Sequence, residues 1–128
     1  MMIKYSRHPR FVHQMKKLLK KYRTLEEDLE IAKTFTIELF HNHTPKIDSG
    51  SIWLVPGFDR DIIQIYKIKK FACKSLRGKG VRSGIRVVYA LAPKTLEVIF
   101  LEIYYKEKDN TDMDYDFAKS FIAEWETK

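Results

Sequence analysis

The spacing of apolar residues changes along this chain, and that change limits the folds it can adopt. Up to about residue 40, apolar side chains recur every three or four residues, as in helices with one buried face. From about residue 62 to residue 105 they tend to alternate with polar ones, as in strands with two different faces. Helices followed by a run of strands and then a final helix predict an α+β fold.

Two helices are predicted in the N-terminal part, after a short strand near Met2–Tyr5. The first extends from about Pro9 to Tyr22, and the second begins after a capping box at Thr24–Glu27. Their apolar positions lie on one stripe of each helix: Phe11, Met15, Leu18, Leu19 and Tyr22 in the first, and Leu25, Leu29, Ala32, Phe35 and Leu39 in the second. The one-residue hinge between Tyr22 and Thr24 favours an antiparallel helix hairpin.

The C-terminal part is predicted to form a sheet followed by a helix. Residues 41–61 contain two prolines and two glycines, which indicate a loop or an irregular edge segment. Three β-rich runs follow and are expected to pair antiparallel: Ile62–Cys73, Ile85–Leu91 and Leu96–Tyr105. A last helix is expected from about Asp114 to Trp125. The prediction is one domain, residues 1–128, with a helix hairpin packed on a curved antiparallel sheet and a C-terminal helix.

The positive charge is concentrated in two segments of the chain. The formal net charge is +7, but residues 1–23 hold eight basic and no acidic residues, and residues 62–106 hold ten basic and two acidic ones. A positive potential on part of a small domain attracts polyanions, most commonly nucleic acid. No apolar run is long enough to span a membrane, and the first residues lack the apolar core of a secretory signal, so we expect a cytoplasmic protein without a membrane partner.

Alternation along the strands predicts a cationic sheet face. Lys67 and Lys69 share one face of the first long strand, Arg86 alternates with aliphatic residues in the second, and Glu102, Tyr104 and Lys106 share a face of the third, with Leu101, Ile103 and Tyr105 opposite. RNA cleavage by the neighbouring 2′-hydroxyl needs a base, positive charge for the phosphorane oxygens and an acid for the leaving oxygen. These residue types supply all three without a metal or cofactor. The alternative is that they are solvated residues of a sheet with one wet face.

Further basic residues are expected to bind RNA phosphates. Arg77, Lys79 and Arg82 lie in a glycine-rich loop in which backbone and phosphate can approach closely, and Lys70 follows the strand lysines. A flexible solvated loop is the alternative for this segment. No metal is expected, since the pair His41 and His43 lacks the further ligands of a zinc site.

Four segments resemble the RelE-type toxins of type II toxin–antitoxin pairs, in the RelE/ParE superfamily: Tyr66–Lys69, Arg77–Gly80, Ser83–Tyr89 and Glu102–Lys106. HigB-like relatives share the glycine-lysine loop, and the helix hairpin is also similar, so the resemblance covers most of the chain except about residues 41–61. It implies a RelE-like fold, a cognate antitoxin, and ribosome-dependent, metal-independent cleavage of mRNA.

The resemblance also implies roles for individual residues. Lys67 and Lys69 match the family's paired lysines, which activate the hydroxyl and bind phosphate, Arg86 matches an arginine that stabilises the transition state, and Lys106 matches a basic residue after the last strand. The family's terminal catalytic tyrosine or histidine has three candidate counterparts here: Tyr104, Tyr105 and Tyr115. Glu102 shares the predicted face of Tyr104, which makes it an alternative general base.

Three functions stay open from the sequence. The first is an mRNA endoribonuclease, for which the cluster of strand cations is the main argument. The second is a ParE-like toxin that binds DNA gyrase, and the third is a catalytically silent homologue that binds RNA or an antitoxin.

Overall fold

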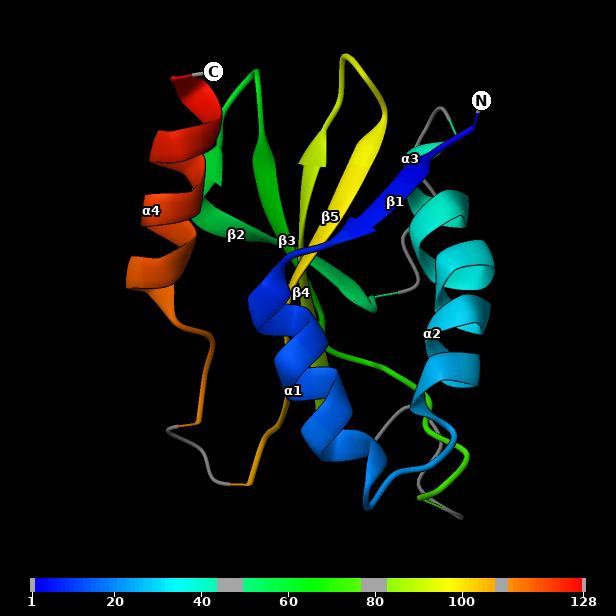
Figure 1. Cartoon of the computed structure of the whole chain (residues 1–128). Helices are drawn as coiled ribbons and strands as arrows, with labels where there is room; N and C mark the ends of the chain where they lie inside the picture. The colour runs from blue at the N-terminus through cyan, green and yellow to red at the C-terminus, as the bar shows by residue number, and fades with distance from the viewer. Residues whose placement is uncertain (1, 44–49, 77–82, 108–110, 128) are drawn as a thin grey trace.

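A five-stranded sheet with the order β1-β5-β4-β3-β2 forms the centre of the computed structural model (Figure 1). The structure describes residues 2–43, 50–76, 83–107 and 111–127. The strands are β1 (Lys4–Arg7), β2 (Ile52–Asp59), β3 (Gln64–Ile68), β4 (Ile85–Ala92) and β5 (Glu97–Tyr105). Strand β1 is parallel to β5, whereas β2, β3, β4 and β5 pair antiparallel in turn. The predicted antiparallel pairing of the three β-rich runs is therefore confirmed.

Helices cover both faces of this sheet. Helix α1 (Pro9–Leu19) is followed by α2 (Leu25–Ala32), a π-helical segment η1 (Lys33–Glu38) and a last short turn α3 (Leu39–His41). These N-terminal helices pack on one face, and α1 and α2 run in opposite directions (Figure 1). Helix α4 (Tyr115–Glu126) packs on the other face. The predicted α+β class, with a helix hairpin, a largely antiparallel sheet and a C-terminal helix, is confirmed.

Each face of the sheet has its own apolar core, because successive side chains of a strand point to opposite sides. Under the N-terminal helices, Phe11, Leu25 and Leu29 are buried against Tyr89 and Phe100 of the central strands. The core under α4 is smaller and is made by these residues: Val55, Phe58, Ile63, Ile65, Val88, Ala90, Ile99, Leu101, Met113, Ala118 and Ile122. Helix α4 leaves part of its face of the sheet open, and this opening holds the candidate site described below.

The predicted capping box at the start of α2 is wrong. Thr24 makes no capping hydrogen bond. Its hydroxyl instead donates to the carboxylate of Asp28 at 2.8 Å and hydrogen-bonds the Ser75 hydroxyl at 2.9 Å, and Asp28 also accepts the backbone N–H of Lys74. Tertiary partners have taken the place of the local cap, and they tie α2 to the segment after β3. Cys73, in that segment, is buried as predicted.

Two strands differ from their predicted extent. The run Ile62–Cys73 forms a strand only over Gln64–Ile68. The segment predicted as a loop or irregular edge contains the edge strand β2, whose pairing with β3 shifts register between Leu54 and Asp59. Pro56 is accommodated there because an edge strand has a row of backbone groups without ladder partners.

A β-bulge in β5 changes which face Leu101 occupies. Val88 pairs with Glu102 and Tyr89 pairs with Phe100, so Leu101 is the extra residue between two ladder pairs. Leu101 packs in the core under α4, whereas Ile103 packs under the N-terminal helices. The prediction that Leu101 shares a face with Ile103 and Tyr105 is therefore wrong, because simple alternation fails at a bulge.

Candidate functional site

A hollow of about 430 Å³ lies on the α4 side of the sheet. The C-terminal ends of β3 and β5 and the N-terminal end of β4 meet there. Seven of the described residues line the hollow: Trp53, Lys67, Lys69, Arg86, Tyr104, Lys106 and Asp112. Five of them were predicted from the sequence as catalytic residues. The structure brings these five together on one surface, and it adds Trp53 and Asp112.

Strand pairing explains why these side chains converge. Trp53 of β2 is the direct partner of Lys67 on β3, and Arg86 of β4 is the direct partner of Tyr104 on β5. Side chains of directly opposed residues project to the same face, so the four line up across neighbouring strands. Lys106, just after β5, is held in place by its backbone N–H, which donates to the Gly84 carbonyl at 2.8 Å.

Lys67 is a buried cation with a carboxylate partner. The residue is only 5% exposed, and its Nζ lies 2.6 Å from Oδ1 of Asp112. Asp112 also accepts the Met113 N–H at 2.7 Å and the Tyr115 hydroxyl at 3.1 Å. Burial acts to raise the pKa of Asp112, but the hydrogen bonds from Lys67 and Met113 outweigh it and lower the pKa. Asp112 is therefore ionised at neutral pH.

Lys69 lies among other cations. Its Nζ is 3.5 Å from the centroid of the Trp53 ring, and the Nζ of Lys67 is 5.2 Å from the same centroid. Burial lowers the pKa of Lys69, and the positive charges of Lys67, Lys106 and Arg86 lower it further. Among the described residues the hollow thus has four basic side chains and one carboxylate, which favours occupation by an anion such as a phosphodiester.

Of the three candidate catalytic tyrosines, Tyr104 lines the hollow. Its hydroxyl lies 3.5 Å from Oδ1 of Asp112, and burial followed by the nearby acidic groups raises its pKa, so the phenol stays protonated. Tyr105 lies on the opposite face, where its ring stacks on that of Tyr22 with centroids 5.9 Å apart. Tyr115 contacts the site only through its hydrogen bond to Asp112.

Glu102 lies outside this hollow. It is 4% exposed, its Oε2 accepts the Asp114 N–H at 2.9 Å, and its Oε1 lies 3.9 Å from Nε of Arg10. Burial raises its pKa, and the hydrogen bond from Asp114 opposes that effect. Arg10 in turn pairs with Asp114 at 2.9 Å. Glu102 therefore links β5 to the start of α4, and this position argues against a role as general base.

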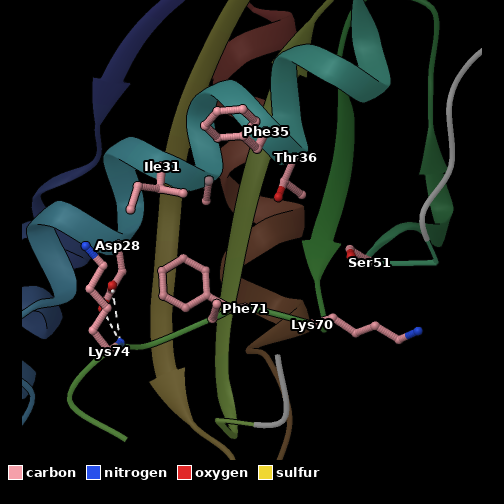
Figure 2. Close-up of a pocket in the computed structure, with 10 residues that line it drawn as sticks. Asp28, Ile31, Phe35, Thr36, Ser51, Lys70, Phe71 and Lys74 are labelled. Carbon is pink, nitrogen blue, oxygen red and sulfur yellow. Dashed lines mark hydrogen bonds between the residues drawn. The ribbon is translucent and has the colours of Figure 1, made fainter. Parts of the chain in front are cut away.

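Of the four predicted RNA-binding residues, the structure describes one, Lys70. Arg77, Lys79 and Arg82 lie outside the described residues. Lys70 lines a different hollow, of about 310 Å³, between α2, η1 and the segment after β3. That hollow is mainly apolar, with Phe35 and Phe71 in its lining, and the Lys70 side chain extends away from Phe71 (Figure 2).

Among the described residues, no three histidine, cysteine, aspartate or glutamate side chains group as metal ligands. His41 is partly buried, and its Nε2 lies 2.8 Å from the hydroxyl of the core residue Tyr89. No helix in the described part of the chain combines the length and apolarity needed to cross a membrane.

Trp53 and Asp112 are the site residues that sequence reasoning missed. Asp112 lies in an acidic stretch that is typical of a helix start, and it contacts a lysine 45 residues away in the chain. Trp53 lies in a segment whose prolines and glycines suggest a loop. Its proximity to the strand lysines comes from the pairing of β2 with β3, so the sequence carries no signal of it.

The fold and the hollow define a small α+β protein with a cationic site on one face of its sheet. No known protein family matches the sequence, and no curated protein sequence matches it. Among solved structures, the chain is similar to the one described as the crystal structure of the archaeal RelE-RelB complex from Pyrococcus horikoshii OT3. The TM-score is 0.49 at 14% sequence identity, over 84% of this chain and 99% of that chain.

Proposed function

We propose that this protein is a RelE-like toxin that cleaves messenger RNA at the cationic hollow. The observation that carries the proposal is the convergence of Lys67, Lys69, Arg86 and Lys106 around the protonated phenol of Tyr104. Such a set provides a base, an acid and positive charge in one place, as cleavage by a neighbouring 2′-hydroxyl requires. The sequence resemblance to RelE-type toxins independently points to the same strand residues.

In the proposed reaction, the neutral amine of Lys69 takes the proton of the 2′-hydroxyl. The 2′-oxygen forms a bond to phosphorus, the bond from phosphorus to the 5′-oxygen breaks, and Tyr104 donates a proton to that leaving oxygen. The products are a 2′,3′-cyclic phosphate and a 5′-hydroxyl, so no metal or co-reactant is needed. Lys69 suits the base role because its pKa is lowered, which increases the fraction of neutral amine.

The remaining cations are proposed to stabilise the phosphorane. Arg86 and Lys106 line the hollow beside Tyr104, and Lys67 is the buried cation of the hollow. In the free protein Asp112 neutralises Lys67, so a substrate phosphate competes with this carboxylate. Asp112 itself is a weak base because its pKa is lowered.

A cytoplasmic location, the ribosome as the place of cleavage and a cognate antitoxin are part of the same proposal. An acidic or amphipathic antitoxin segment that covers the cationic face blocks access of RNA to the hollow. Its gene is expected next to the gene of this protein, so the genomic neighbourhood provides a first check.

The decisive experiment compares two triple variants after induction in a bacterial host. Lys67→Ala/Lys69→Ala/Arg86→Ala removes three charges from the hollow, and Lys16→Ala/Lys17→Ala/Lys20→Ala removes three charges from the exposed side of α1. We expect the wild type and the α1 variant to arrest growth with transcripts cut inside codons, and the hollow variant to be harmless. Equal toxicity of both variants with intact RNA contradicts the proposal, and DNA damage with ongoing translation indicates a gyrase-directed toxin.

One observation favours a second candidate function, a homologue that binds RNA or an antitoxin without cutting. The ion pair between Lys67 and Asp112 occupies a cation that the reaction needs. For this candidate, expression of the wild type does not affect growth, and purified protein binds RNA without producing fragments.

A further inference from the structure

Of the described residues that line the hollow, Trp53 is the large aromatic side chain with the greatest exposure. It is 40% exposed and lies on β2, the edge strand, directly opposite Lys67. Large aromatic side chains are usually buried, and an exposed one beside a cationic groove is the arrangement with which proteins stack unpaired nucleobases. Its role is not explained by packing, because its strand neighbours Ile52 and Val55 are buried in the cores and Trp53 is not.

We propose that Trp53 stacks one unpaired nucleobase of the bound RNA, next to the phosphate held by the lysines. This inference rests on the proposed function and specifies how its site takes a single-stranded substrate. The base of a nucleotide is joined through its ribose to the phosphate, so a base on the Trp53 ring keeps that phosphate within the hollow. An aromatic ring stacks any base, so Trp53 contributes affinity for single strands rather than strong sequence selectivity.

In the free protein, lysine ammonium groups occupy the Trp53 ring that the base is proposed to stack on. The ammonium groups of Lys69 and Lys67 lie 3.5 Å and 5.2 Å from the centroid of the Trp53 ring. In the proposed reaction Lys67 turns to the phosphate and Lys69 turns to the adjoining 2′-hydroxyl, so both amines leave the ring. A cation over an exposed aromatic ring is a weak contact, and stacking of a base on the ring is a stronger one. When a phosphate draws the lysines away, the ring is therefore available to the base.

Fluorescence titration of the full-length chain tests this proposal. The chain has two tryptophans, and Trp125 lies on α4 with its ring stacked on Phe121. Trp125→Phe makes Trp53 the reporter. The probes are a short single-stranded oligodeoxythymidylate, which lacks the 2′-hydroxyl and is not cleaved, and an abasic oligomer with the same number of phosphates. We expect the oligodeoxythymidylate to quench Trp53 and to bind roughly 5- to 150-fold more tightly than the abasic oligomer.

Three further variants separate stacking from fold and charge. The Trp53 variants lack the reporter, so their affinities are measured by the fluorescence anisotropy of end-labelled oligomers. Trp53→Ala is expected to abolish the preference for the oligomer with bases, and Trp53→Phe to retain part of it. Leu54→Ala is the matched control, because Leu54 is 37% exposed on the same strand and faces the other side of the sheet, so the preference stays unchanged.

The outcomes distinguish this inference from the function on which it rests. If the abasic oligomer binds as tightly as the oligodeoxythymidylate and the protein still cleaves RNA, stacking on Trp53 is refuted and the nuclease proposal stands. If neither oligomer binds at low salt and RNA stays intact, both proposals fail.

Discussion

Gly84 permits a close approach between the start of β4 and the end of β5, and its replacement by alanine tests the packing behind the hollow. Its φ is +86°, and a Cβ built there lies 2.9 Å from Cε1 of Tyr105. Real Cβ atoms essentially never come this close to another heavy atom, so the Tyr105 ring must move. That ring is stacked on Tyr22 at the edge of the core, which restricts the movement.

Gly57 is the matched control for this substitution. Its φ is +87°, nearly the same as that of Gly84, but a Cβ there meets no atom within 4 Å. Gly57→Ala is expected to cost only the backbone strain, about 1–2 kcal/mol of unfolding free energy. Gly84→Ala adds the displacement of a packed ring, which costs a further ~1–3 kcal/mol, typical of an overpacked core. The expected total is roughly 2–5 kcal/mol, a large part of the stability of a small domain.

Urea denaturation of the two single variants measures this difference. The unfolding free energy of Gly84→Ala is expected to fall below that of Gly57→Ala, and a smaller side chain at Tyr105 is expected to recover most of the difference. If the two variants are equally stable, or if Tyr105→Leu gives no recovery, contact with the ring is not the cause. Because the Gly84 carbonyl accepts the Lys106 N–H, Gly84→Ala is also expected to weaken RNA binding.

Four further predictions concern charge in and around the hollow. The cleavage rate is expected to rise with pH as Lys69 loses its proton and to level off below the ordinary lysine pKa, because the pKa of Lys69 is lowered; a flat pH–rate profile contradicts its role as base. Glu102→Gln is expected to keep the cleavage rate within about twofold, since Glu102 lies outside the hollow, whereas a loss on the order of a hundredfold restores it as a general base. The pKa of Asp112 is lowered in the folded state, so its stabilising contribution is present above the ordinary aspartate pKa and is lost as pH falls through the folded value. The stability difference between wild type and Asp112→Asn, measured by denaturation across pH, should therefore shrink in acid, and a constant difference refutes this. Binding of single-stranded RNA should weaken with salt. The logarithm of the binding constant should fall against the logarithm of the salt concentration with a slope of about −3 if all four cations contact phosphate. Lys106→Met should make that slope shallower by about 0.7, and an unchanged slope places Lys106 outside the contact.

Much of the candidate site was predictable because it depends on alternation along strands. Lys67 and Lys69 are two residues apart, as are Glu102 and Tyr104, and such pairs share a face wherever the strand is regular. The antiparallel pairing of the β-rich runs then brings Arg86 opposite Tyr104. The bulge at Leu101 is invisible to this reasoning, because it depends on how two strands align and not on the pattern within either.

Position relative to the sheet was harder to predict for residues at strand ends. Lys70 directly follows Lys69 in the chain, so alternation places it on the opposite face, where it lines the apolar hollow. Glu102 has the expected face, but α4 begins directly above it, so the Asp114 N–H and Arg10 engage its carboxylate. The sequence predicts the helix that covers Glu102 and does not predict where that helix packs.

Apart from the edge strand β2, the sequence by itself determined the order of helices and strands, the class of fold and the cationic face, because each follows from spacing between residues close together in the chain. The tertiary structure alone decided that Asp112 neutralises Lys67, that Trp53 borders the hollow and that Thr24 bonds to Ser75 instead of capping its helix. These contacts join residues distant in the chain. Burial and competition among hydrogen-bond partners select them, and both depend on how the whole chain packs.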